Sequence, residues 1–338
     1  MRAVAVAVLL AALSTGGAAG SARADDFVLR PLVTDRADAQ LVNPWGLAAE
    51  GRGPWWVANE ARSSSTLYAR DGRKQHLTVS VRGGPTGVVF NRGHGFEVGR
   101  AAPARFIFAC EDGMIRAWSP TVPRGWSTEA VVAIDAGGSG AVFRGVTLAR
   151  GRLYATDFHN GRVLVFDSRW RPVLRAGAFV DPSIPEWYAP FGIQAAGGRI
   201  FVTYAWRAPV NGNDAPTGGY VDEFDRDGRL VARVGHTNEL DEPWGIALAP
   251  RGFGRLGGEL LVANFGSGRI NVYARRGLDG WAFRGRLPVT VPAVWGIAFG
   301  AGGASGPRTT LFYAAGPHRW HGATEVDIHG VLGAIAPA

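Results

Sequence analysis

The stretch Pro243-Trp244-Gly245-Ile246-Ala247 decides the fold, because versions of it recur along the chain. Each copy has a glycine followed by a short apolar run. The other copies are Pro44-Trp45-Gly46-Leu47-Ala48, Pro85-Thr86-Gly87-Val88-Val89, Phe143-Arg144-Gly145-Val146-Thr147, Pro190-Phe191-Gly192-Ile193-Gln194 and Val294-Trp295-Gly296-Ile297-Ala298. Successive glycines lie 41, 58, 47, 53 and 51 residues apart. A four-stranded propeller blade takes about 40 to 50 residues, so the repeat predicts an all-β, six-bladed β-propeller.

Further strands follow each copy of the motif at similar offsets. Second apolar runs occupy residues 55–58, 106–110, 153–156, 200–203, 260–263 and 311–314. A polar turn with a glycine and an alternating apolar run comes next, most clearly at 157–166 and 264–273, and this pattern is typical of a hairpin. Weaker fourth strands are expected at 75–81, 129–134, 230–234 and 283–289. The sequence thus predicts four strands per blade.

The last blade lacks a fourth strand in sequence order. Its strands are expected at 295–299, 311–314 and 331–335, close to the C-terminal end. Residues 27–34 precede the first motif and belong to no other blade, so we expect them to pair with the last blade. This pairing closes the ring and covers sheet edges that would otherwise promote aggregation. Residues 25–338 therefore form one domain.

The N-terminal residues are typical of a secretory signal peptide. A charged start, Met1-Arg2, precedes an apolar stretch at 3–13, and Ala22-Arg23-Ala24 has the form that signal peptidase accepts. A membrane anchor would need about 20 apolar residues, and the polar residues and glycines at 14–17 interrupt this stretch. We predict cleavage of residues 1–24, export to the periplasm or the medium, and no membrane span.

Charge and cysteine content exclude other classes. The formal net charge is +8, and the arginines that supply it are scattered without a basic run, so nucleic-acid binding is not expected. Cys110 lies in an apolar run and is the single cysteine, so it reads as a small buried hydrophobe and no internal disulfide can form. We expect a monomer.

Several segments resemble known propellers. The P-W-G-[LI]-A motifs, residues 261–266 and residues 314–317 resemble NHL-like propellers. Residues 157–161, 181–182, 189–191 and 249–254 are similar to those of an uncharacterised family of exported bacterial proteins. Members of that family often carry a C-terminal PEP-CTERM sorting tail, which is absent here, so the resemblance implies release rather than envelope sorting. It implies the fold far more than an activity.

Oxygen-bearing residues end the second strand in several blades and could meet at the channel mouth. They are Asn59, Glu111, Asp157 and Asn264, with Tyr204 and Ala315 at the equivalent positions of the other two blades. Such oxygens are the ligands that Ca²⁺ prefers. The same residue types also hydrogen-bond the backbone of a turn, and the sequence favours this structural role over a metal site.

A second set precedes the motif glycine and is mostly aromatic. The candidates for ligand binding are Trp45, Arg144, Phe191, Trp244 and Trp295, and Thr86 holds the position in the second blade. The architecture also resembles gluconolactonase-type propellers, in which metal ligands such as Asn and Asp come from this position. No Asn or Asp stands there in this chain, which counts against a lactone hydrolase. Packing between blades is the favoured alternative for these rings.

Other chemical motifs are weak. His318 and His321, with His329 nearby, supply only part of a zinc site. His159 lies in a turn and lacks a nucleophile motif. Residues 252–257 match G-x-G-x-x-G, but a strand rather than a helix follows. None of these predicts a site.

The sequence predicts a binding or interaction propeller without enzymatic activity or a cofactor. Its ligand would be a small molecule or an extracytoplasmic protein partner, held at the channel mouth. The alternative is a calcium-dependent, lactonase-like hydrolase that uses Asn59, Glu111, Asp157 and Asn264 around Ca²⁺.

Overall fold

A computed structural model describes residues 27–100, 102–173, 176–207, 218–277, 280–321 and 324–338, without the side chains of 318–328. The predicted signal peptide lies outside the described residues. The described chain is all β apart from short 3-10 turns. No helix in this part of the chain is long and apolar enough to cross a membrane.

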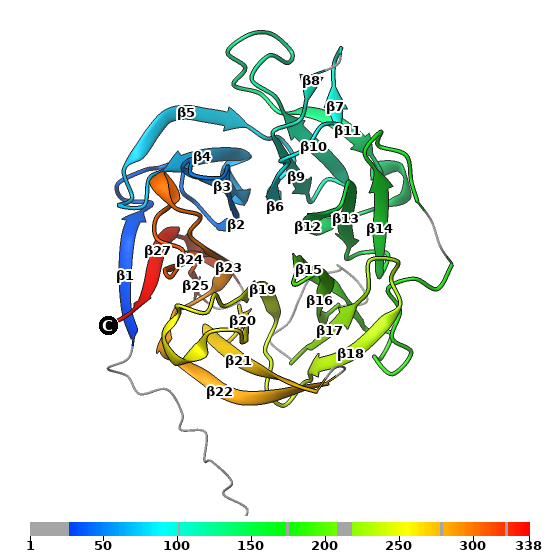
Figure 1. Ribbon diagram of the computed structural model, residues 1–338. Coiled ribbons are helices and arrows are strands. Elements are labelled where there is room, and N and C mark those ends of the chain that lie inside the picture. Colours follow the sequence, from blue (N-terminus) through cyan, green and yellow to red (C-terminus); the bar gives the residue numbers. More distant parts are fainter. Residues whose placement is uncertain (1–26, 101, 174–175, 208–217, 278–279, 322–323) are drawn as a thin grey trace, which may run out of the picture.

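Six antiparallel sheets surround a central axis (Figure 1), which confirms the predicted six-bladed propeller. From the axis outward, blade one contains β2 (Pro44–Ala49), β3 (Trp55–Asn59), β4 (Ser64–Tyr68) and β5 (Lys74–Ser80). Blade two contains β6 (Pro85–Phe90), β9 (Phe106–Cys110), β10 (Met114–Trp118) and β11 (Val131–Asp135). Blade three contains the described strands β12 (Phe143–Ala149), β13 (Arg152–Asp157) and β14 (Arg162–Asp167).

The remaining blades follow the same order. Blade four contains β15 (Tyr188–Ala196), β16 (Arg199–Trp206), β17 (Tyr220–Phe224) and β18 (Leu230–Gly235). Blade five contains β19 (Pro243–Leu248), β20 (Leu260–Asn264), β21 (Arg269–Arg276) and β22 (Gly280–Thr290). Blade six contains β23 (Val294–Phe299), β24 (Leu311–Ala315), β27 (Val331–Pro337) and β1 (Phe27–Thr34). Two small hairpins, β7 (Glu97–Val98) with β8 (Ala102–Pro103) and β25 (His318–His321) with β26 (Thr324–Ile328), lie outside this repeat.

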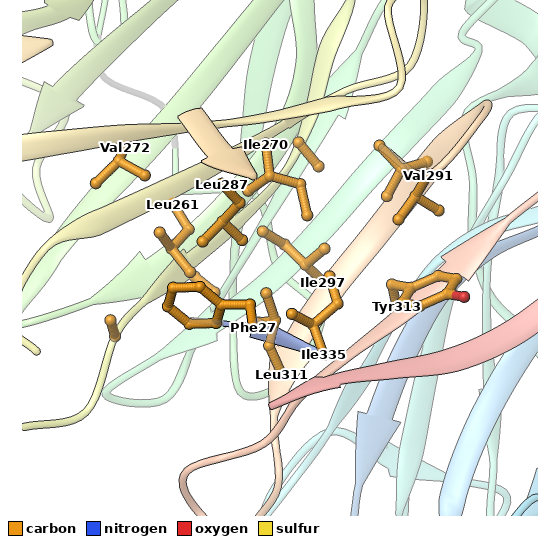
Figure 2. Packing of buried hydrophobic residues seen from close by; sticks show 14 of the residues in the cluster. Phe27, Leu261, Ile270, Val272, Leu287, Val291, Ile297, Leu311, Tyr313 and Ile335 are labelled. Atoms are coloured by element: carbon orange, nitrogen blue, oxygen red, sulfur yellow. The ribbon is translucent and has the colours of Figure 1, made fainter. Parts of the chain in front are cut away.

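The ring closes as predicted, through the pairing of β1 with β27. The two strands are antiparallel, from Phe27 opposite Pro337 to Thr34 opposite Val331. Phe27 is 5% exposed and belongs to a core cluster shared by blades five and six. Figure 2 shows its ring beside Leu311 and Ile335. The N-terminal strand therefore contributes buried apolar surface as well as hydrogen bonds.

The motif glycines form an inner ring in which neighbouring blades touch through their backbones. In every blade the pairing register shifts at the motif, so the first strand carries a β-bulge there. A Cβ atom on Gly192 would lie 2.1 Å from the Trp244 carbonyl oxygen, and one on Gly245 would lie 2.3 Å from the Trp295 oxygen. Each motif needs glycine because the next blade occupies the space of a side chain.

Most of the core lies between blades. Trp56 of blade one stacks on Phe106 of blade two, with ring centroids 3.9 Å apart. Cys110 is buried and free, and burial raises the pKa of its thiol to about 12. The cysteine therefore packs as an apolar side chain, as expected from the sequence.

Alternation of strand direction divides the loops between two faces of the disc. Hairpins joining first to second strands share one face with those joining third to fourth strands. We call this the lower face. Hairpins joining second to third strands, and the connections between blades, lie on the opposite, upper face.

Candidate functional site

Aromatic side chains from four blades meet on the axis and close the channel. Trp45 of blade one stacks on Trp295 of blade six at 3.5 Å between centroids, and it contacts Trp244 edge-on at 5.7 Å. It also reaches Phe191 of blade four at 6.0 Å. Blades one and four are opposite one another in a ring of six, so this contact crosses the axis. Phe158 and Phe265 flank the group, and we call these six residues the aromatic plug.

The plug shows where the structure places the predicted ligand-binding aromatics. Their exposed fractions are 3% for Trp45, 0% for Phe191, 8% for Trp244 and 2% for Trp295. Trp45, Trp295 and Phe265 form one continuous stack. Both faces of the central Trp295 ring are therefore covered by other rings of the plug.

Arg144, the fifth residue of this set, lies against the plug beside two carboxylates. Its guanidinium carbon is 5.3 Å from the Trp45 ring centroid and 5.6 Å from that of Phe158, which is within cation–π range. Its Nη1 donates to Glu111 Oε1. Glu111 is therefore brought to the axis by an ion pair that joins blades two and three.

Glu60 and Asn43 complete this group, which we call the upper-mouth cluster: Asn43, Glu60, Glu111 and Arg144. Glu60 hydrogen-bonds Glu111, and its Oε2 accepts from Asn43 Nδ2 at 2.7 Å. Asn43 Oδ1 in turn accepts from Trp295 Nε1 at 3.1 Å. The cluster thus rests directly on the aromatic plug at the upper end of the channel.

The Glu60 carboxyl has a strongly raised pKa. Burial raises the pKa of Glu60 to about 7, and the negative charge of Glu111 acts in the same direction. The hydrogen bond from Asn43 and the positive charge of Arg144 oppose this rise. Protonated Glu60 can therefore donate a hydrogen bond to Glu111.

Two buried donors at this position have no partner. They are Trp45 Nε1 and Arg144 Nε, on side chains that are more than nine-tenths buried. An unpaired buried N–H group costs about 1 to 3 kcal/mol. The upper-mouth cluster and the adjoining Trp45 of the plug therefore each contribute one unused donor.

Hydrogen bonds and an ion pair within the protein engage the predicted metal ligands. Asn59 donates to Thr66 Oγ1 at 2.9 Å, and Asp157 accepts from Arg162 Nε at 3.0 Å. Asn264 Oδ1 accepts from the Asp241 backbone N–H at 2.9 Å. These three residues bond their own blades and adjoining turns, and of the four predicted ligands the structure brings Glu111 alone into the upper-mouth cluster. The described residues contain no group of three His, Cys, Asp or Glu side chains placed to hold a metal ion.

Glu60 and Asn43 are functional candidates that the sequence reasoning missed. Glu60 begins a 3-10 turn, η2 (Glu60–Arg62), one position after Asn59, the strand-end residue that the sequence predicted as a candidate ligand. Asn43 has φ +46°, and the residue before the motif is also left-handed at Gly84, Glu242 and Ala293. An asparagine or glycine directly before the motif proline was a usable signal for this turn.

The weaker motifs lie elsewhere. His329 Nδ1 is 2.9 Å from Asp35 Oδ2 on the upper face. His318 and His321 lie in β25, where side chains are outside the described part of the structure. Residues 252–257 form part of the hairpin between β19 and β20, with a 3-10 turn at η4 (Gly254–Leu256).

The fold and site define the protein as a six-bladed β-propeller with a plugged channel, and comparison with solved structures agrees. A streptogramin B lyase superposes with TM-score 0.57 at 10% identity, covering 94% of this chain and 100% of that one. A glucose dehydrogenase gives TM-score 0.56 at 13% identity, covering 90% and 98%. Virginiamycin B lyase from Staphylococcus aureus gives 0.52 at 13%, covering 91% and 99%. At these identities the likeness extends to the fold alone.

Sequence relatives place the chain in a family. An uncharacterised protein of Acanthamoeba polyphaga mimivirus is 32% identical over 279 residues, which are 77% of this chain and 69% of that protein. A second from the same virus is 31% identical over 288 residues, covering 80% and 76%. The chain belongs to the same family as these viral proteins. No protein-family model matches it.

Proposed function

We propose that the protein is a binding propeller that holds a small polar molecule in the upper-mouth cluster. The observation that supports this most strongly is the pair of unpartnered donors, Trp45 Nε1 and Arg144 Nε, together with the hydrogen-bonded carboxyl groups of Glu60 and Glu111. An oxygen acceptor of the ligand would bond the two N–H groups. A hydroxyl or amine of the same ligand would bond the carboxylates. The fitting ligands are therefore hydroxy acids and amino acids.

Ligand titration tests this assignment. We would screen hydroxy acids, amino acids and polyols by thermal shift and follow hits by tryptophan fluorescence, because Trp45 and Trp295 border the site. Arg144→Gln and Glu60→Gln should each weaken binding of a hit about tenfold or more. Glu186→Gln is the matched control, since this glutamate is exposed on the same face. Hits that bind both cluster variants as tightly as the parent would refute the site.

A hydrolase is the second candidate, because the Glu60 pKa of about 7 suits a general acid or base at neutral pH. Hydrolysis assays with chromogenic esters and lactones, run with added Ca²⁺ and with a chelator, test this second candidate. Turnover lost in Glu60→Gln but kept in Glu186→Gln would favour catalysis. Turnover that instead depends on Ca²⁺ and on Asp157 would favour the calcium-dependent mechanism.

The place of action is proposed from the N-terminal sequence, and we infer export to the periplasm or medium. Expression in a bacterial host should yield soluble protein that begins at Asp25. N-terminal sequencing of the extracytoplasmic fraction checks this. Retention of residues 1–24 in the membrane fraction would contradict it.

A further inference from the structure

A cavity opens on the lower face, at the end of the channel opposite to the upper-mouth cluster. Its volume is about 530 Å³, within the range of small-molecule sites. All six blades line it through their first strands, by Leu47, Val88, Val146, Gln194, Ile246 and Ile297 among others. A narrower space of about 40 Å³, bordered by motif glycines and Trp244, leads from it toward the aromatic plug. The plug therefore separates the two ends of the channel.

The lower cavity combines apolar side chains with polar groups at its rim. Leu248 is 38% exposed there, and Phe90 and Phe299 also line it. Arg92 is the charged side chain among the described lining residues. The first strands are the inner edges of their sheets, so the wall also presents backbone N–H and C=O groups. An apolar body can rest on the side chains while an acidic group bonds the N–H donors and Arg92.

The charges of the molecule are divided between its faces in a way that favours an anion here. Hairpins between first and second strands carry the exposed Arg52, Arg92, Arg150, Arg251, Arg255 and Arg308. The described acids of these hairpins are Glu50, Glu97 and Glu259, and Glu50 pairs with Arg105. The described loops of the upper face carry more acids, which include Asp38, Glu60, Glu111, Glu186, Glu239 and Asp241, than arginines, which include Arg36, Arg62, Arg82 and Arg207. The field at the lower mouth is therefore positive and attracts anions.

We infer that the lower cavity is a second ligand site, which takes an amphipathic anion with an aliphatic body and a carboxylate. The aliphatic body lies in the channel against Leu248 and the first-strand side chains. The carboxylate stays at the rim near Arg92 and the neighbouring arginines. This site is independent of the upper-mouth cluster, since the aromatic plug stands between them.

Calorimetric titration with dodecanoate, below its micellar concentration, tests the inference. Dodecyltrimethylammonium has the same chain with the opposite charge, and acetate has the charge without the chain. Dodecanoate should bind at one site, and both comparison compounds should bind at least tenfold more weakly. Trp55 lines the cavity and gives an independent fluorescence signal.

Variants locate the binding. Leu248→Asp should weaken dodecanoate binding about tenfold or more, and Arg92→Gln should weaken it several-fold. Arg226→Gln, in the hairpin between β17 and β18 of blade four, is exposed on the same face away from the channel and should leave binding unchanged. Equal binding of the cationic compound, or unchanged binding in both cavity variants, would overturn the inference. Attachment to phosphatidylglycerol vesicles without binding of free dodecanoate would overturn it in favour of a membrane surface.

Discussion

At the residue scale, the site depends on neighbours that are far apart in sequence. The pre-glycine aromatics could be predicted because they occupy one position of a repeat. Glu60 could not be predicted, because its raised pKa arises from burial over the plug and from the charge of Glu111 in the next blade. A glutamate at a turn carries no such information by itself. The convergence of Arg144 with these residues likewise depends on the ring arrangement.

The raised pKa of Glu60 predicts a pH dependence of stability. The folded protein holds the Glu60 proton up to about pH 7, whereas an unfolded chain releases it near 4.5. The folded state binds more protons between these values, so stability falls as pH rises. Relative to Glu60→Gln, the parent should lose on the order of 1 to 2 kcal/mol between about pH 5 and about pH 8, allowing for partial exposure.

Urea unfolding of both proteins across this range measures the difference. Burial also raises the pKa of Asp222 to about 7. Asp222 is present in both proteins, so its contribution to the pH dependence cancels in the difference between the parent and Glu60→Gln. Parallel stability curves would mean that Glu60 does not hold a proton at neutral pH.

The packing of the aromatic plug predicts that alanine substitutions at two tryptophans differ greatly in their effect on the unfolding free energy. Trp244 is 8% exposed and its Nε1 donates to the Arg144 carbonyl oxygen at 3.2 Å. Trp244→Ala should cost about 3 to 5 kcal/mol of unfolding free energy. Trp126→Ala is the control, because that ring is 97% exposed, and its cost should be below about 0.5 kcal/mol. Similar values for the two variants in urea unfolding would show that the plug is not a packed core.

At the element scale, strands were predictable wherever they belong to the repeat. The bulged first strand, the apolar second strand and the closing strand at 27–34 all follow from motif position and from the need to cover a sheet edge. The hairpins β7–β8 and β25–β26 were not predicted. They occur once each in loops, so no internal comparison within the sequence marks them.

Removal of the closing strand should destabilise the whole ring. A chain beginning at Pro44 lacks the pairing of β1 with β27 and the buried Phe27 and Val33. It should melt well below a chain beginning at Asp25, or aggregate through the exposed edge of β27. Thermal unfolding and light scattering of the two proteins check this. Equal melting temperatures and a monomeric short chain would show that closure contributes little.

At the scale of the whole molecule, the glycine ring sets the distance between blades. Gly192→Ala would place a Cβ atom 2.1 Å from the Trp244 carbonyl oxygen, which is backbone and cannot move alone. The change should cost about 1 to 3 kcal/mol or more through overpacking. Gly138→Ala, where no atom lies within 4 Å of the added carbon, should be nearly neutral. If urea unfolding gave equal stabilities, the blades would not be held apart by backbone contact.

The division of charge between the faces has a consequence for approach from solution. Basic hairpins below and acidic loops above give the molecule a permanent dipole moment along the propeller axis. The long-range field therefore draws anions toward the lower end of the channel, which the aromatic plug separates from the upper end. A charged neighbour exerts a torque on this dipole and so orients the molecule. The torque weakens as salt shortens the Debye length, which is about 8 Å at physiological ionic strength. The rate at which an anion reaches the lower mouth should thus fall as ionic strength rises.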